Sequence, residues 1–509
     1  MSKKNSEFGE MLRTLGQVAL YGDEFTEQRV DAAPKGPDIY REVLRGMIQD
    51  NDSNATGLFA KAQALKQSLE GRFIEREPEI LGVLAGLFSN EPVLLIGPPG
   101  TGKTKLVEKL GEAINGKYFY YLLHQFMEAD ELLGPPNVKK YIEEGKYERS
   151  ETGGLQQADI AFFDEPFKAS SPVRNMLLDI MLYKRYKSGD KEIKLPLLGL
   201  FMAANEMPED SEDDAFKDRL VIKVFVQKLS REGRVKMLST QGEKDADRAT
   251  TLAQTGIMKV DEVKAIQDEV DKRMVAAKSN KALMDSFDNT MADVQAGGLE
   301  ISDRTFKKVW KVAASCSVVF NEPAVTSEDL AAALYLCAPK SEEDYGIIED
   351  AISKNKLSPT YEATKIVMSV ATEVYNKFEE AQKAGARKDR LAQYVRALDD
   401  LDATSKQAKV VAKTYNGNPK VTGLVTQLDQ LIVKVDQYVD KERDTAKKEL
   451  ARQEAEREKL RRQQEAERDR LRRQREEQNS DNAPMAMLPA PSSAEPDGGD
   501  QQQKLPMQS

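Results

Sequence analysis

Short apolar runs form the clearest pattern in the first half of the chain. They alternate with stretches of helical periodicity, and each run ends at a turn residue or a polar residue. Continuous apolar strands separated by helices predict an α/β fold, with a parallel sheet covered by helices on both faces. The predicted strands are Val93–Ile96, Ile160–Phe163, Leu197–Ala204 and Val221–Val226.

The chain before this sheet has a different texture. Residues 1–70 are predicted to be a helical extension, in which Glu10–Leu20 has helical apolar spacing and Asp31–Asp38 is a loop. The sequence indicates no function for this extension. The α/β domain is expected to occupy residues 71–229.

A helical lid is predicted to follow at residues 230–340. Its two best-marked helix starts have N-cap residues at Ser302 or Asp303 and at Thr326 or Ser327. A further helical domain is expected over residues 341–440, with a break at Pro359.

The last part of the chain is strongly polar. Residues 441–478 are almost wholly charged, Gln or Ala, and Leu450, Leu460 and Leu471 do not keep a seven-residue step. This pattern favours a solvated single helix with salt bridges, and a coiled coil stays as the alternative. Residues 479–509 are rich in Pro, Gln, Ser, Asp and Gly, which predicts a disordered tail.

Composition narrows the class of protein. The 509 residues are 40% hydrophobic and 31% charged, with a formal net charge of -10, so nucleic acid is not expected as the main ligand. The two cysteines, Cys316 and Cys337, are expected to be free thiols. Met1–Glu10 lacks the apolar core of a secretory signal, and no window approaches about 18 apolar residues. We expect a cytoplasmic protein with no membrane span.

A phosphate-binding loop directly follows the first predicted strand. Gly97–Thr104 matches the pattern G-x-x-x-x-G-K-[ST], and a predicted helix continues from Lys105. Glycines let backbone N–H groups turn toward a phosphate, the lysine reaches the β- and γ-phosphates, and the threonine hydroxyl binds Mg²⁺. ATP and Mg²⁺ are therefore the expected cofactors. The predicted contacts are Gly97, Pro98, Pro99, Gly100, Thr101, Gly102, Lys103, Thr104 and Lys105.

Two carboxylates end the second predicted strand. Asp164 and Glu165 follow the apolar run Ile160–Phe163. After a phosphate loop, this arrangement predicts that Asp164 holds Mg²⁺, directly or through its water, and that Glu165 orients and deprotonates the attacking water.

With both motifs in place, residues 71 to about 340 resemble the MoxR branch of AAA+ ATPases, and are most similar to the RavA-type regulatory ATPases. The order of several segments carries the resemblance, and together they span a little over half the chain. The segments are Gly97–Thr104, Glu144–Arg149, Ala158–Ala169, Ala203–Glu209, Ala215–Leu220 and Ile301–Arg304.

The resemblance implies roles for further residues. Asn205 stands at the sensor 1 position and would bond the γ-phosphate and the attacking water. Arg219 corresponds to the arginine finger, which reaches the nucleotide of a neighbouring subunit, and Arg304 to the sensor 2 arginine of the lid, which contacts the γ-phosphate. Phe73 and Ile74 occupy the place of the adenine cradle, with plain core packing as the alternative.

The resemblance also implies an assembly. Such proteins are usually rings of six subunits, and they typically work with a partner that carries a von Willebrand factor A domain. They are similar to chaperones that assemble, activate or insert metal into a protein client. The sequence departs from its relatives at Pro166 and at Tyr183–Arg185, which bears on the remodelling surface more than on the chemistry.

Other polar residues carry simpler interpretations. His124 is the only histidine, so no histidine-based metal site or triad is expected. The acidic stretch Glu206–Asp214 is interpreted as a solvated loop, and Trp310 as a core residue of the lid.

Three functions are weighed. The main hypothesis is a MoxR/RavA-like ATPase that remodels a protein client. A nucleic-acid-directed motor is the second, against which the net charge and the lack of a basic segment with interleaved aromatics argue. The third is a scaffold that uses ATP only as an assembly ligand, against which Glu165, Asn205 and Arg219 argue.

Overall fold

The computed structural model describes residues 37–48, 56–134, 141–143, 154–188, 191–208, 214–240, 256–385 and 391–481. Contacts divide the chain into one unit that ends at Glu442 and a second that begins at Arg443. Several predictions concern segments outside the described residues: the first 36 residues, the Glu144–Arg149 match, most of the acidic stretch and the tail beyond Asp481.

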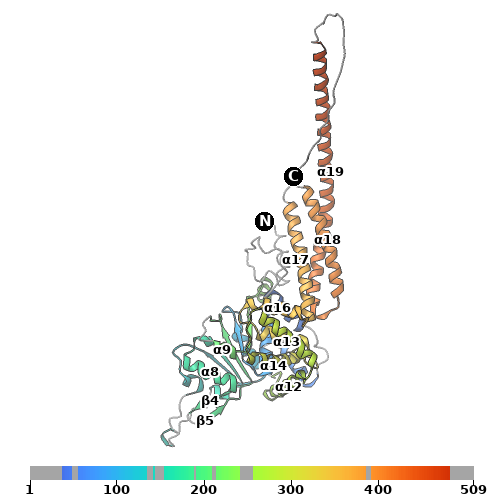
Figure 1. Ribbon diagram of the computed structural model, residues 1–509. Helices are drawn as coiled ribbons and strands as arrows, with labels where there is room; N and C mark the ends of the chain where they lie inside the picture. The colour runs from blue at the N-terminus through green and yellow to red at the C-terminus, as the bar shows by residue number, and fades with distance from the viewer. Residues whose placement is uncertain are drawn as a thin grey trace, which may run out of the picture. The chain divides into compact units, whose positions relative to one another are not determined.

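A five-stranded parallel sheet forms the centre of the first unit (Figure 1). Its strand order, β2-β3-β6-β1-β7, places the strand before the phosphate loop between two later strands. The register aligns Ile96 with Ala204 and Phe225, so the carboxyl ends of β1, β6 and β7 lie together. The strands are β1 (Val93–Ile96), β2 (Tyr118–Leu122), β3 (Ile160–Asp164), β6 (Gly199–Ala204) and β7 (Ile222–Phe225).

The four predicted strands are confirmed within about two residues at their ends, and the predicted fold class is confirmed with them. The prediction omitted β2, an edge strand whose residues are half-buried or exposed and therefore lack a continuous apolar run. It also omitted a small antiparallel hairpin that projects from the sheet domain (Figure 1). This hairpin consists of β4 (Arg185–Ser188) and β5 (Lys191–Lys194).

Helices enclose the sheet. α4 is buried along nearly its whole length and packs against β1, β6 and β7, which explains its almost entirely apolar sequence. α5 packs against β2, β3 and β6. The helices of this part are α3 (Gly57–Glu70), α4 (Glu77–Ser89), α5 (Lys103–Ala113), α6 (Ala129–Leu133), α8 (Ser171–Tyr183), α9 (Asp214–Arg219) and α10 (Arg231–Thr240), with short 3-10 turns η1 (Leu155–Gln157) and η2 (Pro166–Lys168).

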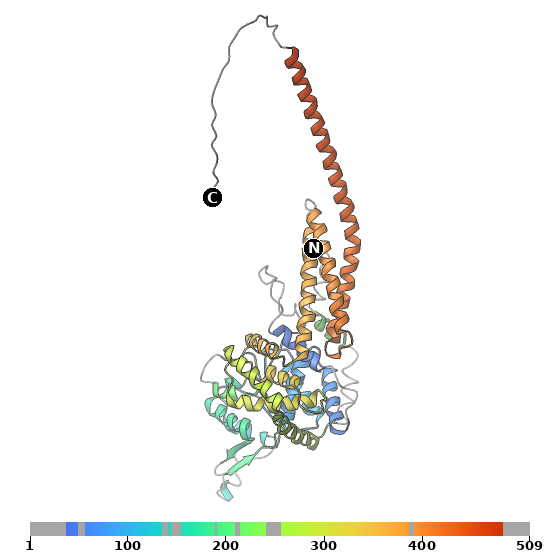
Figure 2. The ribbon, with the colours of Figure 1, turned by 45° about the vertical axis from the view of Figure 1, so that its right-hand side comes forward.

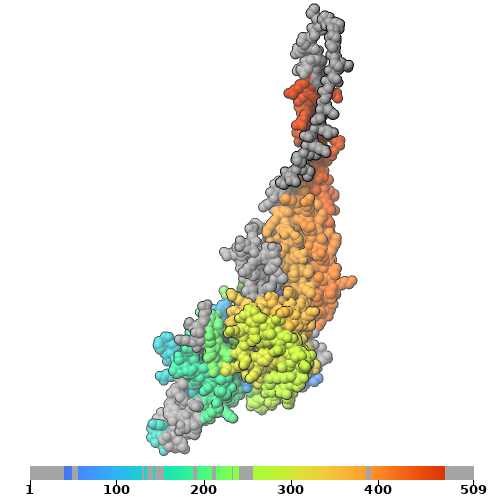
Figure 3. Space-filling model, viewed as in Figure 1, coloured from blue at the N-terminus to red at the C-terminus, as the bar shows by residue number. Residues whose placement is uncertain are grey.

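The lid helices pack on the α4 side of the sheet, because α12 and α14 contact α4 and α15 contacts β7. Lid residues (yellow-green) lie beside those of the sheet domain (Figures 1 and 3). Ser302 caps α14 by accepting a hydrogen bond from the Thr305 N–H, and Thr326 caps α15 by accepting one from the Asp329 N–H. Trp310 is buried, as expected for a core residue. The predicted lid region contains α12 (Val260–Lys278), α13 (Lys281–Ala296), α14 (Asp303–Val319) and α15 (Ser327–Cys337). The next elements, η4 (Glu342–Asp344) and α16 (Tyr345–Lys354), lie in the region predicted as the following domain, and we group them with the lid because α16 packs against α13 and α15.

A helical bundle follows the lid (Figure 2). The Phe378 ring of the first helix packs edge-on against Tyr438 of the third, with 4.9 Å between centroids. Ser405 of the second helix donates to Asp436 of the third at 2.8 Å, so three successive helices pack together. Pro359 is the first residue of the first helix, which explains the predicted break. The elements are α17 (Pro359–Gly385), α18 (Leu391–Tyr415), η6 (Pro419–Val421) and the beginning of α19 (Thr422–Asp481).

The part of α19 in the second unit has a polar surface. Leu460 and Leu471 are 55% and 53% exposed. Arg461 pairs with Glu465 at 3.0 Å, and Arg462 with Glu458 at 2.6 Å, both at the i,i+4 spacing that supports an isolated helix. These contacts favour a charged single helix, and whether it pairs with another chain stays a prediction.

Helix α2 (Pro37–Ile48) belongs to the extension whose function the sequence did not indicate. It packs against α4, α15, α16, α17 and η6. The Tyr40 ring stacks on Tyr345 of the lid at 3.8 Å between centroids, and Gly46 lies against the Lys420 carbonyl, where an added Cβ would stand only 2.2 Å away. α2 therefore joins the sheet domain, the lid and the bundle.

Candidate nucleotide site

The phosphate loop follows β1 at the carboxyl end of the sheet. Gly97, Gly100 and Gly102 have positive φ angles of 155°, 78° and 89°, which only glycine adopts at little cost. A Cβ at Gly97 would stand 2.3 Å from the Val226 carbonyl oxygen. The loop thus depends on glycine both for its curvature and for its close approach to the chain after β7.

Lys103 is the first residue of α5. Its Nζ donates hydrogen bonds to the carbonyls of Gly97 and Pro98, at 2.5 and 3.1 Å. Partial burial lowers the pKa of Lys103, and the charges of Asp164 and Glu165 oppose that shift. The lysine therefore lies within the field of both predicted carboxylates.

Asp164 and Glu165 sit at the end of β3. Partial burial, with the charge of Glu165, raises the pKa of Asp164, while Lys103 acts in the opposite direction. Glu165 has a left-handed backbone, with φ 55° and ψ 54°, and its N–H donates to the Ala203 carbonyl at 2.8 Å. A non-glycine residue held in this conformation is a local strain that the neighbouring strand maintains.

Asn205 follows β6, the strand beside β3. Its Nδ2 donates a hydrogen bond to Oε1 of Glu165 at 2.6 Å, and Lys168 lies 3.5 Å from the other oxygen. The structure thus brings together the predicted phosphate-binding lysine, both carboxylates and the sensor 1 amide.

A cavity of about 450 Å³ adjoins the phosphate loop. This volume falls in the range of roughly 300–1,000 Å³ typical of small-molecule sites. Phe73 and Ile74 lie in its wall, as the adenine prediction requires. The wall also contains residues that the sequence analysis missed, because no motif marks them; these are Arg72, Arg76, Lys228, Leu229, Arg234 and Met237.

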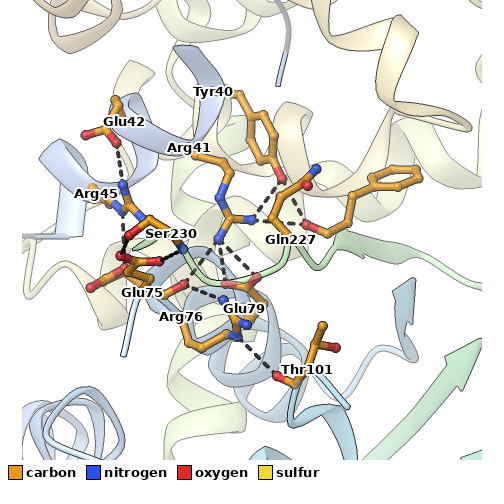
Figure 4. Close-up of polar contacts among 12 residues, drawn as sticks. Tyr40, Arg41, Glu42, Arg45, Glu75, Arg76, Glu79, Thr101, Gln227 and Ser230 are labelled. Carbon is orange, nitrogen blue, oxygen red and sulfur yellow. Dashed lines mark hydrogen bonds and ion pairs between the residues drawn. The ribbon is translucent and has the colours of Figure 1, made fainter. Parts of the chain in front are cut away.

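A polar network supports this wall (Figure 4). Arg76 donates from Nε to the Thr101 carbonyl of the phosphate loop at 3.2 Å, and Glu75 accepts from the Ser230 N–H at 2.7 Å. From α2, Arg41 bonds Glu79 at 3.0 Å and the Phe225 carbonyl at 3.1 Å. The network joins the segment before α4 to the phosphate loop, the end of β7 and the extension.

The donor set fits MgATP. Thr104 begins α5 beside Lys103, and together with Asp164 it offers a hydroxyl and a carboxylate oxygen. Mg²⁺ in nucleotide sites is held by one or two protein oxygens together with phosphates and water. No group of three or more His, Cys, Asp or Glu suited to a metal occurs among the described residues.

Arg219 and Arg304 lie elsewhere. Both line a second cavity, with Asn90 and Pro92 from the loop before β1. Arg304 pairs with Asp218, and Arg219 donates to the Ala215 carbonyl at 2.9 Å. This cavity is at the amino end of β1 and β7, whereas the phosphate loop is at the carboxyl end, so a four-residue strand of roughly 13 Å separates them. In this arrangement, neither arginine adjoins the phosphate loop of its own chain.

The strand order, the phosphate loop and the carboxylates after β3 define a P-loop ATPase of the AAA+ class. Within that class, residues 60–268 match the family model described as the MoxR domain of MoxR–vWA–beta-propeller ternary systems. This part of the chain is a MoxR-type AAA+ ATPase domain.

The chain is also similar to several individual proteins. An uncharacterised protein of Methanocaldococcus jannaschii is 34% identical over 260 residues, which cover 51% of this chain and 66% of that protein. A structural protein of Acidianus two-tailed virus is 26% identical over 341 residues, covering 60% and 54%. Chaperone MoxR1 of Mycobacterium tuberculosis is 24% identical over 219 residues, covering 42% and 57%. The chain spans less than two thirds of each of these relatives.

Proposed function

We propose that the protein hydrolyses ATP with Mg²⁺ and uses the reaction to remodel, assemble or activate a protein client. The observation that carries the proposal is the convergence of Lys103, Asp164, Glu165 and Asn205 at one end of the sheet, with Asn205 bonded to Glu165. Phosphoryl transfer depends mainly on positioning and charge neutralisation, and this group supplies both.

Each residue has a defined part in this proposal. The N–H groups of the phosphate loop and Lys103 bind the phosphates, and Thr104 and Asp164 hold Mg²⁺, which neutralises developing charge on the phosphates when bound. Glu165 accepts the proton of the attacking water, and Asn205 orients that carboxylate. Phe73 and Ile74 hold adenine in the adjoining cavity.

Arg219 and Arg304 act on the nucleotide of a neighbouring subunit. Their cavity lies a strand length from the phosphate loop of their own chain, so a phosphate that they contact belongs to another molecule. Hydrolysis in this proposal therefore requires a ring, for which six subunits is the expected number in proteins of this family.

The family description supports the expected partner. MoxR domains of the matching family occur in systems with a von Willebrand factor A protein, and we propose such a partner here. No helix in the described part of the chain is long and apolar enough to cross a membrane. Both cysteines are buried free thiols, which supports our proposal of a cytoplasmic protein.

One observation favours the scaffold alternative. A viral relative is named a structural protein, and it matches over a longer stretch than the other relatives described above. If this chain used ATP only for assembly, wild-type protein would form rings with ATP and show no turnover. The nucleic-acid motor would instead show ATPase activity stimulated by DNA or RNA.

The deciding experiment compares steady-state ATPase activity of wild type, Glu165→Gln and Arg219→Ala, with mass measured with and without ATP. The proposal expects turnover only in wild type and an ATP-dependent rise to a ring. Full activity of Arg219→Ala would overturn the role in a neighbouring site, and nucleotide binding without any turnover would support the scaffold.

A further inference from the structure

The second cavity is a cationic site. Its volume is about 210 Å³, and five of its lining side chains are basic while one, Glu91, is acidic. The basic side chains come from the end of α8, the end of α9 and one side of α14; they are Lys184, Arg219, Arg304, Lys308 and Lys311. Three separate elements thus direct positive charge to one place.

Three of these cations have carboxylate partners. Lys308 pairs with Glu91, Arg304 with Asp218, and Lys311 with Asp271 at 3.0 Å. Lys184 and Arg219 have no such ion pair in the described part of the chain. The cavity therefore carries two cations that have no carboxylate within ion-pair distance among the described residues.

One side-chain nitrogen of each of these two residues is also unsatisfied. Lys184 Nζ and Arg219 Nε are buried, and neither has a hydrogen-bond partner among the described residues. A polar group buried without a hydrogen bond destabilises the folded protein by about 1–3 kcal/mol, and a charged group does so by more. Burial lowers the pKa of Lys184 to about 8, with Lys308 and Lys311 acting in the same direction and Glu91 opposing them.

The backbone also marks Lys184. This residue ends α8 in the left-handed conformation, with φ 49° and ψ 44°. Asn or Gly would adopt this conformation at lower cost, so a lysine here is a local exception to the usual C-cap preference. Strained positions of this kind cluster at functional sites.

We propose that Lys184 joins Arg219 and Arg304 in binding the terminal phosphates of a nucleotide held by a neighbouring copy of this chain. This inference rests on the proposed function. A cavity of about 210 Å³ is below the size typical of a whole small-molecule site, so it suits a phosphate group rather than an entire nucleotide. The nucleoside remains in the neighbour's larger cavity, and Lys184 supplies a charge-assisted hydrogen bond to the phosphate end.

The first test compares wild type with Lys184→Asn, which removes the charge and suits the left-handed backbone. Loss of one charge-assisted hydrogen bond should lower kcat roughly 10- to 100-fold. The affinity of isolated Lys184→Asn chains for a fluorescent ATP analogue should stay unchanged, because Lys184 lies outside the nucleotide cavity of its own chain. Lys184→Arg should recover most of the activity. Lys307→Asn is the matched control, because Lys307 is exposed on α14 and does not line the cavity.

A second test asks whether Lys184 acts between chains. In a mixed ring, a Glu165→Gln chain can supply its intact Lys184 to the nucleotide held by a neighbouring Lys184→Asn chain. That neighbour retains Glu165, so its site has both residues. Rings that contain both variants, verified by mass, should exceed the summed activity of the two separate preparations. No gain in mixed rings would overturn the proposal, because a purely structural role of Lys184 predicts no such complementation.

The outcomes also separate other sources of the anion. If inorganic phosphate binds wild type but not Lys184→Asn, and kcat is unchanged, the site takes free phosphate and the proposal fails. An unchanged kcat without phosphate binding also overturns it, and leaves an acidic protein segment as the occupant to seek. Failure of the proposed function is distinct, because it appears as inactive wild type or a fully active Arg219→Ala.

Discussion

The side-chain amide of Asn205 donates a hydrogen bond to Oε1 of Glu165 across 2.6 Å. The two residues end neighbouring strands, and the left-handed backbone of Glu165 turns its side chain toward that amide. One carboxylate oxygen is thereby held by Asn205 while the other faces Lys168 at 3.5 Å. The direction of the carboxylate thus depends on a residue 40 positions away in sequence.

The first prediction concerns this pair. Glu165→Gln should lower kcat about 10²- to 10⁴-fold, because the amide cannot accept the proton of the attacking water. Asn205→Ala should lower kcat less, because the carboxylate remains but loses its orientation. Both should retain ATP affinity, measured by equilibrium binding. An Asn205→Ala enzyme with wild-type kcat would contradict the positioning role.

The second prediction concerns Arg219 and Arg304. Arg219→Ala should lower kcat about 10³- to 10⁵-fold, the range of an arginine finger, with ATP affinity of the isolated chain unchanged. Arg304→Ala should lower kcat as well, and it also leaves Asp218 without its ion pair. Lys307→Ala on the same helix should behave as wild type. Weakened nucleotide binding by isolated Arg219→Ala chains would show instead that the arginine serves its own site.

Much of the nucleotide site could be predicted because its residues follow strands in short motifs. Gly97–Thr104 and the pair Asp164–Glu165 each depend on local sequence, and the parallel register then brings their strand ends together. Strand β2 was missed because its exposed edge position removes the continuous apolar run.

The second cavity could not be predicted, for a tertiary reason. Lys184 and Arg304 are 120 positions apart in the sequence, and their meeting depends on the packing of α14 beside the loop before β1. The sequence marked Tyr183–Arg185 only as a departure from relatives. Nothing in that segment indicated that Lys184 would be buried among other cations.

The third prediction concerns the phosphate loop. Gly97→Ala should abolish nucleotide binding, because the new Cβ would stand 2.3 Å from the Val226 carbonyl, which belongs to rigid backbone. Gly346→Ala is the matched control, because a Cβ added at Gly346 in helix α16 would have no atom within 4 Å. That variant should gain roughly 0.4–1 kcal/mol in stability, measured by denaturant unfolding, and bind nucleotide normally. Normal binding by Gly97→Ala would contradict the described loop geometry.

The last prediction concerns the pH dependence of stability at Lys184. The pKa of this lysine is about 8 in the folded protein and 10.5 as an ordinary value, because burial and the charges of Lys308 and Lys311 outweigh the attraction of Glu91. Below about pH 8 the Lys184 side chain is protonated in both the folded and the unfolded chain, so burial of its charge destabilises the folded protein by the full amount. Between pH 8 and 10.5 only the unfolded chain holds it, so the wild type gains stability as pH rises.

Lys184→Asn should therefore melt at a higher temperature than wild type near pH 7, in the absence of nucleotide. The difference should shrink between pH 8 and 10.5 to a constant remainder, because Asn still suits the left-handed backbone better than Lys. Lys307→Asn replaces an exposed lysine of α14, so the difference in melting temperature between it and wild type should not change with pH. Thermal unfolding of the three proteins across this pH range measures the effect, and a gap between Lys184→Asn and wild type that does not change with pH would mean that Lys184 is not desolvated in the folded protein.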